Sequence, residues 1–205
     1  MSKNRKKQII FAILCAVFAL ATFATVFLPA IRHQKPDNSD VGLGDFKVMD
    51  IIKGGLYDYE NDKKDESTGE LIKYNKLSEK AQFYYQTFIL LDEARVGSLF
   101  AVFLMLTLVC ALLMFASAIV SIGAGSDSFI LQMVLGLLHV GFTCACLFSL
   151  PALASLVAND IFITLNFTVV GGIALPVLLV SGIGFTVCAI LCRLASGKKL
   201  FKTKK

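Results

Sequence analysis

The chain contains no tryptophan and has unusually few charged residues for its length of 205 residues. Charged residues make up 17% of the chain, against roughly a quarter in an ordinary soluble domain. Hydrophobic residues make up 56%, and the mean hydropathy is +0.72. This scarcity of charge excludes a disordered chain, a collagen, a coiled coil and a nucleic-acid-binding domain. It predicts an integral membrane protein, with all 205 residues in a single membrane domain.

Fixed charge is almost absent from four long stretches of the chain. Between Val96 and Cys192 only Asp127 and Asp160 carry one, and Gln8–Ile31 has none. A helix needs roughly 20 apolar residues to cross about 30 Å of hydrocarbon, and barrel strands would be shorter and would alternate. The sequence therefore predicts transmembrane helices at residues 9–31, 96–122, 129–157 and 171–193. A cleaved signal peptide is disfavoured because the first apolar stretch runs on to Ile31.

Acidic residues are missing from both ends of the chain, which fixes the expected orientation. Residues 1–8 carry four Lys or Arg, and residues 193–205 carry six. The segment Arg32–Arg95 has ten basic and thirteen acidic residues, a net charge of −3. The positive-inside rule then predicts a multi-pass protein of the cell membrane with both termini cytoplasmic. Residues 32–95 and 158–170 become the extracellular loops, 123–128 a cytoplasmic turn, and 194–205 a basic cytoplasmic tail.

No cysteine lies in the large loop, and no two cysteines have Cys-x-x-Cys spacing. The six cysteines fall inside the predicted spans, where the simplest role is as small apolar packing residues. A quinone-linked thiol oxidoreductase is the functional alternative, but it would need thiols at the outer face. Paired carboxylates, metal-ligand spacing, a nucleophile–base pair and a phosphate-binding loop are also missing. We therefore expect no enzyme activity, no cofactor and no metal.

The large loop is too apolar in two places to be disordered. Val41–Tyr59 and Phe83–Leu91 are rich in aromatic and branched residues, and we expect them to form two ordered arms that pair or pack. Glu60–Thr68 between them reads as a solvated, mobile tip. In the second loop, Ile161–Val170 has strand-like alternation. It either pairs with the first loop, in contact with Val41–Tyr59, or extends the fourth helix.

Three sets of residues are candidate sites. Gln132, His139 and Thr143 form a polar stripe on the third span, either for proton or ion passage or for helix packing. Gly184, Cys188 and Cys192 form a small-residue face suited to helix packing, within the bundle or between copies. Clustered lysines near the C-terminus are candidate contacts for anionic lipid, and they are Lys198, Lys199, Lys202, Lys204 and Lys205.

Four spans, a large first outer loop and a small second one, with the segment Gly42–Gly44, resemble claudin-like four-helix (tetraspan) membrane proteins. Segments such as Phe46–Gly55 are also similar to uncharacterised small four-span proteins of low-GC Gram-positive bacteria. The resemblance implies an all-α membrane bundle of four transmembrane helices with a small extracellular domain, a short β-sheet formed by the two outer loops. The loop tryptophans and cysteine pair of claudins are absent here, so the resemblance assigns no site residue.

Two classes of function follow from these features. The first is a non-catalytic tetraspan that acts through protein–protein contacts of its extracellular domain and helix faces. The second is a small channel or an accessory subunit of a membrane transporter, which would need a polar path such as the Gln132–Thr143 stripe. The expected partners are membrane lipids together with another membrane protein or a second copy of the chain. Nucleic acid is not expected.

The topology predicts which positions an impermeant thiol reagent reaches in intact cells. In a cysteine-free background, Lys63→Cys should be labelled, because residue 63 lies in the extracellular loop. Lys202→Cys should be labelled only after the membrane is permeabilised. Labelling of residue 202 in intact cells would overturn the four-span arrangement.

Overall fold

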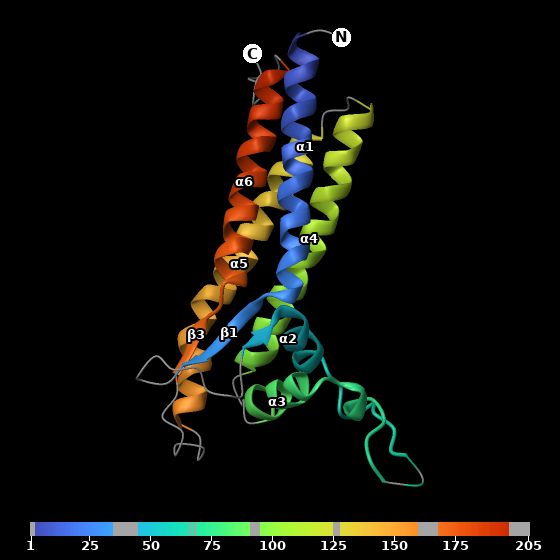
Figure 1. The fold of residues 1–205 in the computed structure, drawn as a ribbon, viewed down its shortest axis with the longest axis vertical. Coiled ribbons are helices and arrows are strands. Elements are labelled where there is room, and N and C mark those ends of the chain that lie inside the picture. The colour runs from blue at the N-terminus through green and yellow to red at the C-terminus, as the bar shows by residue number, and fades with distance from the viewer. Residues whose placement is uncertain are drawn as a thin grey trace, which may run out of the picture. The chain divides into compact units, whose positions relative to one another are not determined.

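The computed structural model describes residues 3–34, 45–65, 67, 69–90, 95–124, 128–159 and 168–196. Four of its helices are long and apolar enough to cross a membrane. They are α1 (Lys3–Ala24), α4 (Val96–Ala124), α5 (Phe129–Asn159) and α6 (Ala174–Ala195) (Figure 1). Two shorter helices, α2 (Val48–Gly55) and α3 (Glu79–Phe88), lie between α1 and α4 in the sequence. The chain is therefore mostly helical and has the composition of a multi-pass membrane protein.

The first apolar run changes from helix to strand before it ends. Helix α1 ends at Ala24, the 3₁₀ turn η1 covers Thr25–Phe27, and strand β1 begins at Pro29 and ends at Gln34. The length of the uncharged apolar run predicted a helix as far as Ile31. Pro29 has no N–H to continue a helix, and a proline also disfavours helical geometry in the residue before it. The last residues of the predicted span therefore belong to a sheet.

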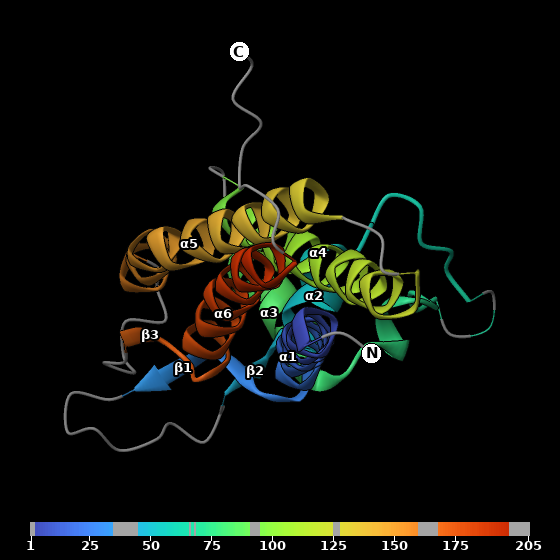
Figure 2. The same ribbon diagram turned by 90° about the horizontal axis from the view of Figure 1, so that it is seen from above.

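A small antiparallel sheet has the strand order β2–β1–β3, where β2 is Phe46–Lys47 and β3 is Thr168–Gly171 (Figure 2). Strand β1 pairs with β3 from Ile31↔Gly171 to Gln34↔Thr168. Its other edge pairs with β2, with a register irregularity after Pro29. The predicted sheet is thus present, with its outer strands in the two predicted loops. Its central strand contains Pro29–Ile31, which was expected to end the first helix, together with the first three residues of the predicted large loop.

Of the two segments predicted to be in contact, Val41–Tyr59 and Ile161–Val170, the structure describes residues 45–59 and 168–170. β1 lies between β2 and β3, so these two strands share a sheet without pairing directly. Residues 161–167, where most of the strand-like alternation falls, lie outside the described residues. Gly172, just after β3, donates its N–H to Ala30 O at 2.8 Å. A Cβ at Gly172 would collide with the Pro29 carbonyl, so this close approach requires glycine.

The chain divides into two compact units. Unit 1 comprises Met1–Thr25, Leu106–Cys144 and Pro176–Lys205, and unit 2 comprises Val26–Met105 and Ala145–Leu175. The core of unit 1 brings together parts of α1, α4, α5 and α6, and most of its members are small or sulfur-containing. The buried members are Cys15, Ala16, Ala19, Cys110, Met114, Ala118, Leu135, Phe185, Cys188 and Ala189.

Unit 2 contains a module, here called the α2–α3 module (residues 45–90), with an aromatic core. Phe46 is fully buried, and its ring centroid lies 5.6 Å from that of Tyr84 and 6.0 Å from that of Phe88. Ser78 caps α3, because its hydroxyl accepts a hydrogen bond from Ala81 N at 3.2 Å. The described parts of the two arms expected from the sequence, residues 45–59 and 83–90, are therefore packed together, mainly as helices.

Removing the Phe46 ring should unfold or loosen the α2–α3 module. Phe46→Ala empties the centre of three aromatic contacts, and a buried Phe→Ala change costs about 3–5 kcal/mol. Tyr59→Ala is the matched control, since Tyr59 is 54% exposed, and it should change stability by less than about 0.5 kcal/mol. Amide hydrogen exchange in nanodiscs measures both. Equal protection of residues 46–55 in the two variants would contradict this core.

Candidate functional site

The polar side chains of α5 in unit 1 form hydrogen bonds to groups on α4, on α6 or on α5 itself. Gln132 Nε2 donates to Ser121 Oγ at 3.1 Å and to Ser117 O at 3.4 Å, both on α4. Thr143 Oγ1 donates to His139 O, one turn earlier on its own helix, at 2.9 Å. All three residues of the predicted stripe are buried, with exposures of 2% or less. Each side chain of the predicted stripe therefore has its own hydrogen bond inside unit 1.

His139 joins α5 to α6 through its ring. Its Nε2 lies 3.0 Å from Leu178 O, and because a carbonyl only accepts, Nε2 must carry the proton. Nδ1 has no hydrogen-bond partner among the described residues. The hydrogen bond at Nε2 therefore links two helices of unit 1.

Gly182 makes the His139 contact possible. A Cβ at Gly182 would lie 2.5 Å from His139 Cδ2 and 2.9 Å from Val140 Cγ2. The absent side chain lets the imidazole reach the α6 main chain at Leu178. Gly136 is a second such position, since a Cβ there would collide with the Thr186 hydroxyl. The close packing of α5 against α6 depends on both glycines.

The predicted small-residue face of α6 is also occupied within unit 1. Gly184 faces the Phe18 ring of α1, and a Cβ there would lie 2.5 Å from Phe18 Cε1. Cys188 belongs to the buried core, and the Cys192 thiol lies 3.5 Å from its acceptor, Gln8 O. These contacts hold α1 against α6 within unit 1.

A polar cluster lies where the basic ends of α1 and α6 meet. It surrounds a cavity of about 10 Å³ lined by residues that include Gln8, Ser121, Gln132 and Arg193. That volume suits a single water molecule and is too small for a phosphate group. The predicted lipid-contacting lysines, Lys198, Lys199, Lys202, Lys204 and Lys205, lie outside the described residues.

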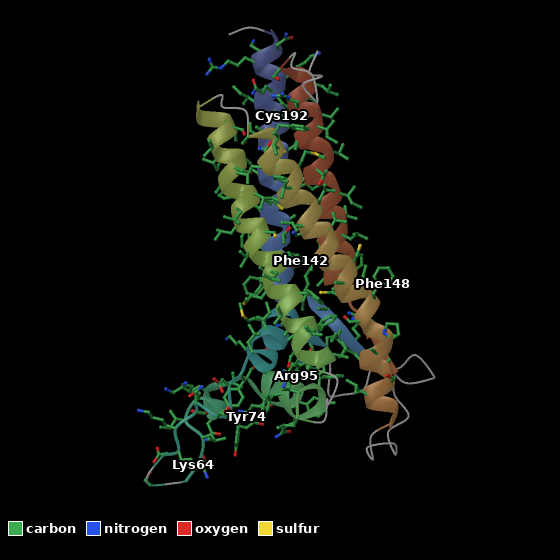
Figure 3. All side chains as sticks on the ribbon, turned by 180° about the vertical axis from the view of Figure 1, so that it is seen from behind. Lys64, Tyr74, Arg95, Phe142, Phe148 and Cys192 are labelled. Carbon is green, nitrogen blue, oxygen red and sulfur yellow. The ribbon has the colours of Figure 1, made fainter. Side chains whose placement is uncertain are left out.

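The predicted acidic tip of the large loop is built around one carboxylate in unit 2. Asp62 accepts hydrogen bonds from Tyr57 Oη at 2.7 Å, Lys73 N at 2.9 Å and Tyr74 N at 2.8 Å. Lys64 and Leu71 form an isolated bridge further out along the same extension (Figure 3). The tip is exposed, as expected, but its base is tied together by these bonds.

Three tyrosines close the base of this tip. The ring centroid of Tyr57 lies 5.5 Å from that of Tyr74 and 4.9 Å from that of Tyr85. Partial burial and the hydrogen bond to Asp62 raise the pKa of Tyr57. Burial opposes ionisation of Asp62, but the Tyr57 hydroxyl and the main-chain donors of residues 73 and 74 outweigh it and lower the pKa of Asp62. At neutral pH the pair is therefore a carboxylate bound by a protonated phenol.

The attachment of the α2–α3 module to α4 was not foreseen from the sequence. Tyr84 is fully buried and donates from its hydroxyl to Gly97 O at 3.0 Å, in the first turn of α4. A Cβ at Gly97 would collide with the Phe88 carbonyl, and one at Gly55 would collide with Ala101. The only signal in the sequence was that small residues occupy these positions.

Large apolar side chains are exposed on this module. Leu90 is 61% exposed and Tyr59 54% exposed, and three more such residues, Met49, Leu56 and Ile72, are between 38% and 41% exposed. Among the described residues, no group of three or more His, Cys, Asp or Glu could hold a metal ion.

Adding one methyl group at Gly182 should separate α5 from α6. Gly182→Ala forces the new Cβ against His139, and overpacking of this kind costs about 1–3 kcal/mol. Gly141→Ala is the control on α5, because nothing lies within 4 Å of a Cβ there, and helix propensity makes alanine neutral to about 1 kcal/mol better. Thermal unfolding of the purified protein reports both. A Gly182→Ala variant as stable as Gly141→Ala would show that the His139 contact does not hold the helices.

Comparison with known proteins assigns no family to this chain. No protein-family model, no curated protein and no solved structure matches it.

Proposed function

We propose that this chain is a non-catalytic tetraspan protein of the cell membrane, claudin-like in arrangement, that binds another membrane protein through its α2–α3 module. The observation that carries the proposal is a difference between the two units in how their polar and apolar side chains are placed. Polar side chains inside unit 1 bond to one another and to the main chain, whereas unit 2 holds a separately cored module with exposed apolar side chains. This difference favours the α2–α3 module as the surface that binds a partner.

The charge distribution supports an extracellular module. The thiol of Cys192 near the end of α6 lies 3.5 Å from Gln8 O near the start of α1, so the two basic ends lie together. The segment that contains the module has the net negative charge. Under the positive-inside rule the basic ends are cytoplasmic, and the module, in the loop between the first two spans, faces outward.

The side chains exposed on the module suit a protein partner. Tyrosine and methionine are enriched at protein–protein interfaces, and tyrosine is common among the residues that dominate binding. Tyr59 and Met49 are exposed on this module, beside Lys53 and Glu60, which give it a polar surround. A transport function has less support, because Gln132, His139 and Thr143 are each engaged in an internal bond.

Site-specific photo-crosslinking in cells tests the proposal. A photoreactive phenylalanine analogue at Tyr59 or Met49 should give a discrete protein adduct at native expression. The same analogue at Val180, 62% exposed on α6 in unit 1, should give none of that size. Adding Phe46→Ala should abolish the adduct, because the module then loses its core.

Co-expression of two differently tagged copies of the chain shows whether the crosslinked protein is a second copy or another membrane protein. Absence of a discrete adduct from both module positions would overturn the proposal. An adduct that persists at full yield in the Phe46→Ala variant would also overturn it, since binding would not then need the folded module.

A further inference from the structure

An apolar groove runs between α1 and α6 at the basic ends of these helices in unit 1. Its volume is about 340 Å³, and its lining residues are Lys7, Ile10 and Phe11 from α1 with Leu191, Leu194 and Ala195 from α6. On each helix the three residues follow the i, i+3, i+4 spacing that defines one face. Two helix faces therefore form the walls, and Lys7 supplies the charge.

We propose that this groove binds one anionic phospholipid, with an acyl chain along the apolar walls and the headgroup phosphate at Lys7. The walls are accessible: Ile10 is 56% exposed, Leu194 51% and Leu191 38%. Lipid tails gain little from a merely apolar surface, because the surrounding membrane is equally apolar. Selectivity must therefore come from the shape of the groove and from its charge.

The charge around the groove is of one sign. Residues 1–31 and 171–205, which include both helices, contain no Asp or Glu. Arg5 and Lys6 precede Lys7 on the exposed first turns of α1. Arg193 lies on α6, with its guanidinium carbon 5.5 Å from the centroid of the Phe129 ring of α5. Lys7 is thus the cation that lines the groove, and basic pockets between transmembrane helices on the cytoplasmic side are suited to anionic headgroups.

A polar cavity among the described residues at the same end of unit 1 is too small for a headgroup. The neighbouring polar cavity, with Arg193 in its lining, has a volume of about 10 Å³. The groove proposal is independent of the module's partner, since every groove residue belongs to unit 1 and none belongs to the α2–α3 module. It also differs from the expected contacts of the C-terminal lysines, which lie beyond residue 196.

Native mass spectrometry of the full chain, titrated with phosphatidylglycerol or with phosphatidylcholine of the same acyl chains, tests the site. The wild type should bind one phosphatidylglycerol saturably and in preference to phosphatidylcholine. Lys7→Gln should weaken phosphatidylglycerol binding about fivefold, the loss expected for one cation near a headgroup. Lys6→Gln removes the same charge one residue away, outside the groove lining, and should weaken it less.

Filling the groove separates lipid binding from surface charge. Ala195→Phe should abolish the saturable site without changing the net charge. Val180→Phe, at a 62% exposed position of α6 outside the groove, should leave the site intact. Glycerol phosphate, which has no acyl chain, should not displace the lipid. Equal losses for Lys7→Gln and Lys6→Gln, or unchanged binding in Ala195→Phe, would overturn the proposal and leave only diffuse attraction of anionic lipid to the basic ends.

Discussion

The absence of water from a bilayer core is the constraint on which the long helices depend. Every main-chain polar group there must find its partner inside the protein, and α-helices achieve this along each span. The side chains obey the same constraint. Thr143, Ser121 and Thr186 each donate to the carbonyl one turn earlier on their own helix. Gln132 and His139 bond to neighbouring helices instead, so polarity inside unit 1 serves to join helices.

Small residues provide the second means of joining these helices. Helices in lipid gain no hydrophobic free energy by meeting, so they rely on close contact and hydrogen bonds. Gly182 faces His139, Gly136 faces Thr186, and Gly184 faces Phe18. Each glycine admits a larger side chain from the neighbouring helix. The small-residue face of α6 is therefore used for contacts inside unit 1.

The α2–α3 module is stabilised by a different interaction, the hydrophobic effect. Its core of Phe46, Tyr84 and Phe88 is driven by burial of aromatic surface from water, and the Phe46 ring meets the other two edge-on, as aromatic pairs prefer. Gly54 lets α2 approach the Ala81 carbonyl of α3, while Gly55 faces Ala101 of α4. The Tyr84 hydroxyl then ties the module to the first turn of α4.

The sequence alone determined the number of long helices, the charge of the chain ends and the presence of ordered arms in the first loop. These features depend on local composition, because membrane thickness sets helix length and aromatic density sets the tendency to fold. The arms were predicted without a secondary-structure type, although Val48, Ile51 and Gly55 already show helical spacing. Only the tertiary structure revealed that Pro29–Gln34 is the central strand, since strand pairing joins Ile31 to Gly171 across most of the chain. The tertiary structure also decided which groups form hydrogen bonds with His139 and Gln132. It placed Lys7 beside Leu194 and Ala195 in one groove. Those contacts join residues far apart in sequence, and helical periodicity specifies a face without specifying what lies opposite it.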